Sequence, residues 1–367
     1  MTRSIAILGT RGYPSYYGGF ETAVRHLAPF LADAGWDVTV YGRPDSLAKD
    51  DPTRDSRIQT IQTHGIQSRS LSTLSYGFTS ARHAARSKPD VALIMNVANG
   101  YWLPFLRRAG IPTLVNVDGI EWERAKWGQL AKLVFKRGAH MTARYADELA
   151  HDSLEIGRRW QDEFGRRGVF IPYGGTAPGA QLPIEPGFLA RRYVLFVARF
   201  VPENSFEQFL AAADDLARDT DVVMVGSSGY GGSFDDAAAD LARRRPRFHW
   251  VGHVQDDERL SSLWQHAGAY FHGHSVGGTN PALVQAMAAG APTVARDTPY
   301  NREVLGSAGI FCAPDPQAIA QSIRRLMGSA QMQEQLSTAA ASRAAERYSW
   351  RSVCDTYDSV LRNLVSK

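Results

Sequence analysis

The sequence has few cysteines and no long apolar run. Only two of its 367 residues are cysteine, Cys312 and Cys354, and they lie far apart without the spacing of metal ligands. We therefore expect reduced thiols rather than a disulfide or a zinc site. No window reaches the roughly 18 apolar residues of a membrane-spanning helix, and no signal-peptide pattern follows Met1. These absences favour a cytoplasmic protein.

The charge is also far from extreme. The 41 lysines and arginines nearly balance 37 acidic residues, for a net charge of +4, and no nucleic-acid-binding motif is present. We therefore expect no nucleic-acid partner. A hydrophobic content of 44% with 21% charged residues is typical of globular proteins, and the length suits two domains.

Short apolar runs alternate with helical patterns along the whole chain, which is typical of parallel sheets wound by helices. The strands expected in the first half are Ser4–Gly9, Asp37–Gly42, Ile58–Gly65, Val91–Val97, Pro112–Asp118 and Val169–Tyr173. Those expected in the second half are Arg192–Ala198, Asp221–Gly226, Phe248–Gly252, Ala269–His272 and Pro292–Ala295.

A segment rich in glycine and proline, Gly174–Gly187, separates the two halves. The fold class is therefore predicted to be α/β, with two doubly wound, Rossmann-like domains at residues 1–180 and 188–345 and a closing helix at 346–367. Because ligands of open α/β sheets bind at the carboxyl ends of strands, we expect the two sheets to face each other across a cleft.

The most informative segment is His272–Met287, where a glycine-rich turn leads from an expected strand into an Ala-rich helix. Glycines let the backbone approach a ligand, and the N–H groups and dipole at a helix start attract an anion such as a phosphate. The alternative is a structural turn. His272 and His274 flank this turn without a nearby carboxylate at ligand spacing, so hydrogen bonding or packing is favoured over a metal site.

The first glycine-rich turn, Gly9–Glu21, lacks the spacing G-x-G-x-x-G of a dinucleotide site. A nicotinamide-dependent oxidoreductase therefore stays a weaker alternative. Gly18 and Gly19 precede a helical pattern and would let the backbone approach a sugar or phosphate, unless they only change the chain's direction.

Two further clusters stand where expected strands end. Asp118, with Glu121 close by, has the usual position of a catalytic carboxylate, and an Asx cap is its structural alternative. Arg199 is suited to bind a phosphate in a bidentate manner. Glu203 and Asn204 open the next helix, where capping is the alternative.

Taken together, these segments resemble the retaining GT-B glycosyltransferases of family 4. Within them the chain is similar to the bacterial rhamnosyltransferase-like subgroup with a DUF1972-type N-terminal domain. The matching segments are Gly9–Thr22, Val117–Trp127, Arg199–Asn204 and His272–Met287, with Asn301–Glu303 behind them. The resemblance covers essentially the whole chain, and it implies a hexosyltransferase of GT-B fold that needs neither cofactor nor metal.

The resemblance also implies a role for individual residues. A nucleotide-sugar donor would bind the C-terminal domain and the acceptor the N-terminal domain. The expected catalytic residues are Asp118, Arg199 and Glu203. The expected donor-binding residues are Gly18, Gly19, Arg199, Asn204, His274, Gly277, Gly278, Thr279, Asn280 and Gln285. The expected acceptor-binding residues are Arg11, Tyr17, Glu121, Trp122, Arg124 and Lys126.

The sequence departs from the broader family at three of these positions. A pair of glutamates common in relatives is replaced by Gly277 and Gln285, and a lysine is replaced by Asn204. Loss of the lysine removes one positive charge that other donors must offset. Loss of the carboxylate at Gln285 matters less for a deoxyribose, which favours dTDP-L-rhamnose as donor. A UDP- or GDP-sugar donor and a non-catalytic nucleotide-sugar-binding protein are the alternatives.

The expected acceptor is a polyprenyl-diphosphate-linked saccharide or another oligosaccharide of cell-surface polysaccharide synthesis. Residues 122–138 combine basic and apolar side chains in a helical pattern, and Tyr101–Arg108 adds an aromatic and basic patch. Such a helix can lie on the anionic inner face of a membrane, which gives an expected peripheral location at the cytoplasmic membrane face. An ordinary amphipathic helix is the alternative.

Overall fold

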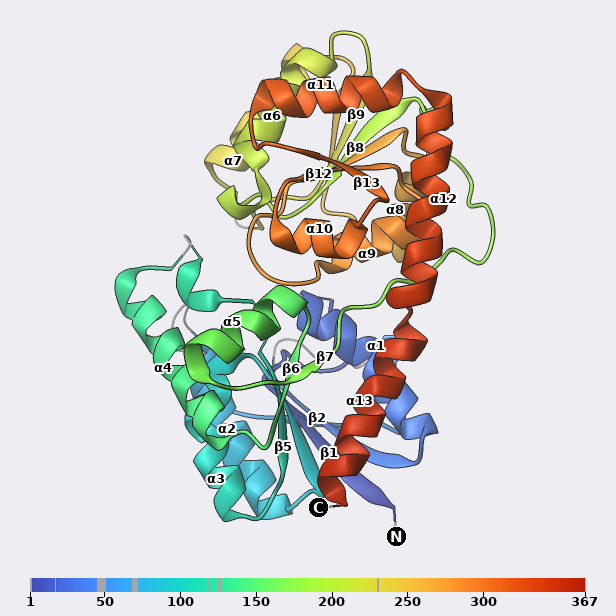
Figure 1. Ribbon diagram of the computed structural model, residues 1–367. Helices are drawn as coiled ribbons and strands as arrows, with labels where there is room; N and C mark the ends of the chain where they lie inside the picture. The colour runs from blue at the N-terminus through green and yellow to red at the C-terminus, as the bar shows by residue number, and fades with distance from the viewer. Residues whose placement is uncertain are drawn as a thin grey trace. The chain divides into compact units, whose positions relative to one another are not determined.

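The computed structural model describes residues 2–16, 18–44, 51–67, 72–117, 119–124, 127–229 and 231–366. The chain forms two compact units (Figure 1). Unit 1 contains residues 1–173 and 350–367, and unit 2 contains residues 174–349. Among the described residues, no helix is long and apolar enough to cross a membrane.

Unit 1 is built on a parallel sheet with the strand order β3-β2-β1-β4-β5-β6-β7. Its elements are β1 (Arg3–Leu8), α1 (Gly19–Asp33), β2 (Trp36–Gly42), β3 (Gln59–Gln62), α2 (Ser72–Ser87), β4 (Val91–Met95), η2 (Val97–Trp102), α3 (Leu103–Arg108), β5 (Thr113–Asn116), η3 (Glu121–Glu123), α4 (Gln129–Tyr145), β6 (Glu148–His151), α5 (Leu154–Phe164), β7 (Val169–Phe170) and α13 (Trp350–Val365).

The closing helix α13 belongs to the core of unit 1. Val353, Tyr357, Leu361 and Leu364 share one face at helical spacing and are buried with residues of α1 and the sheet. Tyr357 also accepts a hydrogen bond of 2.7 Å from the side-chain amide of Asn116 at the end of β5. Burial of one complete helix face fixes α13 against the sheet although it is distant in sequence.

Unit 2 is built on a second parallel sheet with the order β10-β9-β8-β11-β12-β13. Its elements are β8 (Tyr193–Val197), η4 (Pro202–Asn204), α6 (Phe206–Leu216), β9 (Asp221–Val225), α7 (Ser233–Arg244), β10 (Phe248–Gly252), α8 (Asp257–His266), β11 (Ala269–His272), α9 (Pro281–Ala288), β12 (Thr293–Arg296), α10 (Pro299–Leu305), β13 (Gly309–Cys312), α11 (Pro316–Met327) and α12 (Ala330–Arg347).

Both faces of the second sheet are covered. One core packs α8, α9, α10 and α12 on the sheet, and the other packs α6, α7 and α11 on the opposite face. Apolar burial on both faces explains why the strands are continuous apolar runs rather than alternating ones.

Every strand expected from the sequence is present, and the fold class α/β with two doubly wound domains is confirmed. The sequence analysis missed β6 and β13. Both are strands of four residues, Glu148–His151 and Gly309–Cys312, too short to stand out from the helical patterns around them.

Candidate functional site

The strand order of unit 2 reverses between β8 and β11, which are hydrogen-bonded neighbours. At such a switch point the loops leaving the two strands run to opposite sides and open a crevice at their carboxyl ends. Arg199–Ser205 follows β8 and Gly273–Asn280 follows β11. We call these two segments the switch-point loops.

The two switch-point loops are tied to each other by polar contacts. The ring Nδ1 of His274 lies 2.7 Å from Oδ1 of Asn204, whose amide Nδ2 donates to the carbonyl of Arg199 at 2.8 Å. The backbone N–H and the hydroxyl of Ser275 both donate to the carbonyl of Glu203 at 2.9 Å. The predicted residues Arg199, Glu203, Asn204 and His274 are thus brought together in one place.

The loops also approach each other closely at Gly273. A β-carbon on this residue would lie 2.2 Å from the backbone oxygen of Asn204, far inside van der Waals contact. Only glycine fits at this position without moving the loop that follows β8.

The second switch-point loop ends at the start of α9. Gly277 adopts φ of +99°, a conformation that side-chain-bearing residues rarely take. Asn280 caps the helix by accepting from the N–H of Ala282 at 3.0 Å, and Pro281 follows it at the first helical turn. Gly277, Gly278 and Thr279 therefore precede a capped helix whose dipole favours an anion.

Arg199 and Glu203 differ in exposure. Arg199 is exposed and forms no ion pair with any carboxylate that the structure describes, whereas Glu203 is buried in η4. The capping alternative for Asn204 is wrong, because both polar atoms of its side chain bind the switch-point loops and α6 starts without a side-chain cap.

Gln285 lies one helical turn inside α9. It binds Thr176, which lies in the segment that connects β7 to β8. Its Oε1 accepts from the N–H of Thr176 at 3.0 Å, and its Nε2 donates to the carbonyl of Thr176 at 2.8 Å. Both polar atoms of the amide are therefore engaged within unit 2. A contact of Gln285 with a donor ribose stays a prediction that requires these bonds to exchange.

His272 ends β11 directly before the glycine-rich turn. Its Nδ1 lies 3.0 Å from the hydroxyl of Tyr270, and among the described residues its Nε2 has no hydrogen-bond partner. Burial lowers the pKa of His272 to about 3, so the ring is neutral at physiological pH. His272 and His274 thus have the hydrogen-bonding roles expected from the sequence.

The residues predicted for unit 1 fall into three groups. Tyr17, Asp118 and Lys126 lie outside the described residues. Arg11 and Gly18 lie close to Glu21, whose Oε1 accepts from the N–H of Arg11 at 3.0 Å. Gly18, directly before α1, has an extended φ of −171° that any residue adopts, and Gly19 is the first residue of the helix. Gly18 is the N-cap of α1, a position that glycine suits, so a ligand contact at Gly18 stays a prediction.

The third group forms a packed turn before α4. The Glu121 carboxylate is paired with Arg124 at 2.7 Å and accepts from the indole of Trp127 at 2.8 Å. The side chain of Trp122 is only 8% exposed and packs edge-on against Trp160. These contacts support the turn itself, and the structure does not bring Trp122 to the surface.

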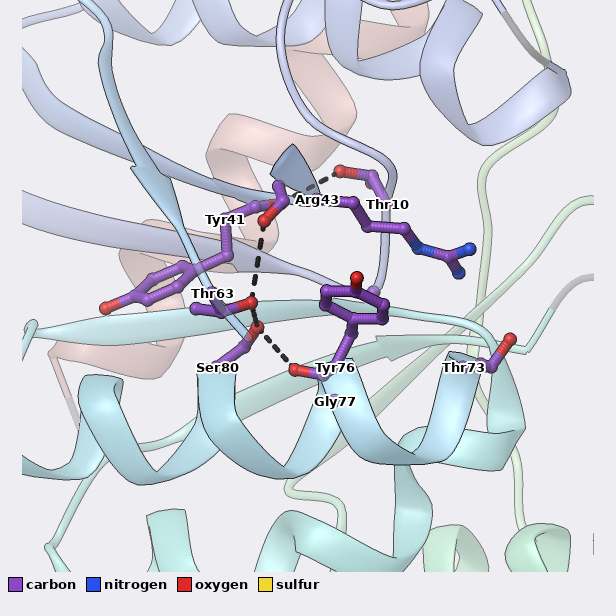
Figure 2. Close-up of a pocket in the computed structure, with 10 residues that line it drawn as sticks. Thr10, Tyr41, Arg43, Thr63, Thr73, Tyr76, Gly77 and Ser80 are labelled. Carbon is purple, nitrogen blue, oxygen red and sulfur yellow. Dashed lines mark hydrogen bonds between the residues drawn. The ribbon is translucent and has the colours of Figure 1, made fainter. Parts of the chain in front are cut away.

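Unit 1 also contains a small pocket that the sequence analysis did not identify (Figure 2). It lies where β1, β2 and β3 end beside α2, and it is lined by Gly9, Thr10, Tyr41, Gly42, Arg43, Thr63, Thr73, Tyr76, Gly77 and Ser80. Figure 2 shows the hydroxyls of Thr63 and Ser80 pointing toward each other, 3.1 Å apart, and Arg43 extending past Tyr76. The Arg43 guanidinium lies 5.2 Å from the centre of the Tyr76 ring.

The hydroxyls of Thr10, Thr63 and Ser80 in this pocket are hydrogen-bonded within the protein. No local sequence motif predicts this pocket. Its lining residues come from three strand ends and a helix, spread over some 70 residues between Gly9 and Ser80. The one signal in the sequence is a series of polar residues, Thr10, Arg43 and Thr63, each placed directly after an expected or observed strand.

Two doubly wound units with parallel sheets define the GT-B fold class for this chain, as predicted. Residues 185–343 match the family model Glycosyl transferases group 1, and residues 2–176 match a domain of unknown function, DUF1972. The match to glycosyl transferases group 1 therefore lies within unit 2, and the match to DUF1972 lies almost wholly within unit 1.

Two curated relatives are mannosyltransferases by name. The chain is 32% identical over 208 residues to phosphatidyl-myo-inositol mannosyltransferase of Mycolicibacterium smegmatis, covering 53% of this chain and 52% of the relative. It is 28% identical over 169 residues to O-antigen chain mannosyltransferase B of Escherichia coli, covering 45% of this chain and 44% of the relative. The chain spans about half the length of the curated relatives it matches.

Solved structures match over the whole chain at low identity. Sucrose-phosphate synthase of Thermosynechococcus elongatus has a TM-score of 0.81 at 19% identity, with 99% of both chains covered. Anabaena HepE in complex with UDP has a TM-score of 0.73 at 15% identity, covering 98% of this chain and all of that one. At these identities the likeness shows the fold.

Proposed function

We propose that this protein is a retaining glycosyltransferase that moves a hexosyl group from a nucleotide-sugar bound by unit 2 to an acceptor bound by unit 1. The observation that carries the proposal is the switch point of unit 2. There an exposed arginine and the capped, glycine-rich start of α9 meet in a group 1 domain. Both features are suited to hold the negative charge of a diphosphate.

Glycosyl transfer breaks the bond between the sugar's anomeric carbon and the donor phosphate, and it forms a bond to the acceptor oxygen. Negative charge grows on the leaving diphosphate while the sugar gains oxocarbenium character. Arg199 and the N–H groups of α9 would stabilise that charge with fixed donors. The proton of the acceptor hydroxyl would pass to an oxygen of the leaving phosphate, and Asp118 would lie near that hydroxyl.

The donor we favour is dTDP-L-rhamnose. Its deoxyribose has no 2′-hydroxyl, and Gln285 uses both polar atoms of its amide on Thr176 rather than presenting them to a ribose. A mannosyl donor is the second candidate, because both curated relatives are named mannosyltransferases.

The acceptor we favour is a sugar linked to a polyprenyl diphosphate, reached from the cytoplasmic face of a membrane. On α4 the side chains of Leu130 and Leu133 are 75% and 63% exposed, beside the exposed cations Lys136 and Arg137. Two exposed leucines next to cations on one helix suit insertion into an anionic lipid surface. Phe105 of α3, a helix that packs on α4, is also exposed.

Thermal unfolding with added nucleotides tests the donor side of the proposal. The full chain is heated with dTDP, UDP, GDP, ADP or NAD, each at roughly 100 times a micromolar dissociation constant. A ligand that binds the native state at that excess adds about 2.7 kcal/mol to the free energy of unfolding. We expect dTDP to raise the midpoint most.

Other results of the unfolding experiment would change the proposed donor or the proposed function. A rise with GDP or UDP in place of dTDP would keep the glycosyltransferase and replace the rhamnosyl donor. A rise with NAD alone would overturn the proposal in favour of a nicotinamide enzyme. No rise with any nucleoside diphosphate would overturn it as well.

A further inference from the structure

A second arginine stands beside the switch-point loops without a carboxylate partner. Arg296 is the last residue of β12, at the carboxyl end of the strand next to β11. Arg296 is partly buried, and its Nη1 donates to the hydroxyl of Ser205 at 3.0 Å. It forms no ion pair within the ranges that the structure describes.

The surroundings of Arg296 are unfavourable for a cation on its own. Ser205 is the residue directly before α6, so the guanidinium lies at the positive end of that helix dipole. Partial burial adds a desolvation cost and lowers the pKa of Arg296, although an arginine stays charged at any physiological pH. An anion bound at the same place would offset both costs.

The local structure holds Arg296 and the switch-point loops as one assembly. The hydroxyl of Ser205 that accepts from Arg296 also donates to the carbonyl of Gly273 at 2.7 Å. The side-chain amide of the buried Asn301 donates to the carbonyls of His274 and Arg296, at 3.0 and 2.8 Å. Ser205 is in addition held in a left-handed conformation, with φ of 55°.

Position 204 lies next to this assembly and is uncharged. Asn204 precedes Ser205, and its side chain is engaged with Arg199 and His274. Arg302 on α10, the helix that follows β12, is exposed and paired with Asp297 at 2.5 Å, so its charge is already balanced. Among these residues Arg199 and Arg296 are the two cations without a carboxylate.

We infer that Arg296 supplies the second positive charge for the donor's diphosphate, in place of a cation at position 204. This inference rests on the proposed function, because it assigns a residue to the same donor site. Arg199 would reach the diphosphate from the loop after β8 and Arg296 from the end of β12. A guanidinium can bind two phosphate oxygens at once, so Arg296 would select a diphosphate over a nucleoside without phosphates.

The test measures binding of dTDP, UDP and GDP, and of the matching nucleosides, to the wild-type chain and to Arg296→Gln by calorimetry. We expect the nucleoside diphosphate that binds best to lose on the order of 10- to 100-fold in affinity, as for loss of a charge-assisted hydrogen bond. Binding of the nucleoside should stay unchanged. Arg302→Gln is the matched control, and it should leave both affinities as they are.

A rescue variant separates charge supply from a structural role. In Arg296→Gln combined with Asn204→Lys the cation returns on the neighbouring loop, and we expect most of the diphosphate affinity to return with it. If Arg296 only held Ser205 in place, Arg296→Gln would weaken nucleoside and diphosphate alike and lower the unfolding midpoint without ligand, and Asn204→Lys would restore nothing.

The inference is overturned by wild-type affinity for the nucleoside diphosphate in Arg296→Gln, or by an equal loss of affinity for the nucleoside. Neither result would affect the proposed function, since the wild-type chain would still bind the nucleotide. If the wild-type chain binds none of the three nucleoside diphosphates, the proposed function fails and this inference fails with it.

Discussion

Arg199 is an exposed side chain at a strand end, where a substitution can test function without disturbing the core. It follows β8 and makes no ion pair with a described carboxylate. We expect Arg199→Ala to lower sugar transfer on the order of 100-fold, the effect of removing one fixed donor to a developing negative charge. Arg192→Ala, which removes an exposed arginine just before the same strand, is the control. Equal turnover of the two variants would remove Arg199 from the mechanism.

His272 should make the stability of unit 2 depend on pH. Burial lowers its pKa to about 3, below the value near 6.5 of an unfolded chain. Between these two values the unfolded state binds a proton that the native state does not. The stabilisation is therefore complete above about pH 6.5 and falls by about 1.4 kcal/mol for each pH unit below it.

The expected outcome is a steeper fall of the unfolding midpoint between about pH 6.5 and 4.5 for the wild-type chain than for His272→Gln. His64→Gln removes an exposed histidine and should keep the wild-type slope. The same slope in all three proteins would show that His272 is not the group that titrates.

At the scale of elements, the close approach at Gly273 joins the two switch-point loops. A methyl group there meets the backbone of Asn204 rather than a flexible side chain, so the loop after β8 must move. We expect Gly273→Ala to cost roughly 1–3 kcal/mol of stability and to weaken nucleoside diphosphate binding. Gly179→Ala is the control, because its β-carbon would meet no atom within 4 Å. Unchanged nucleotide affinity in Gly273→Ala would contradict a site built on these loops.

A separate prediction concerns the contact of α4 with a lipid surface. If Leu130 and Leu133 enter a lipid surface, replacing both by serine should reduce co-flotation with vesicles of anionic phospholipid at low salt. The control is Leu189→Ser, which removes an equally exposed leucine, 72% exposed, from unit 2. Loss of vesicle binding in the control, or wild-type binding in the α4 variant, would argue against α4 as the contact.

How much the sequence predicts depends on how local the information is. The alternation of apolar runs and helical patterns predicted both sheets, and strand ends predicted where Arg199 and Asn204 lie. The burial of Trp122 could not be predicted, because it depends on Trp160, which is nearly forty residues away. Arg296 lies in no motif, and only the placement of β12 beside β11 shows that it reaches the switch-point loops without an ion pair to a described carboxylate.

At the scale of the whole molecule, the two units have separate cores. The helix α13, which follows unit 2 in the sequence, belongs to the core of unit 1. Each unit has its own set of candidate residues. Unit 2 offers cations and a capped helix start, which suit a diphosphate. Unit 1 contains a small polar pocket beside Arg43 and Tyr76. In the function that we propose, unit 2 would bind the nucleotide-sugar and unit 1 the acceptor.

The measurement that tests this account most directly is release of nucleoside diphosphate from dTDP-rhamnose, UDP-glucose and GDP-mannose by the full chain, with a polyprenyl-diphosphate-linked N-acetylglucosamine as acceptor. We predict that one of these donors, dTDP-rhamnose first, is consumed as the sugar appears on the lipid, and that Arg199→Ala nearly abolishes the reaction. Tight binding of a nucleoside diphosphate with no donor consumed would contradict the account and indicate a nucleotide-sugar-binding protein without transferase activity.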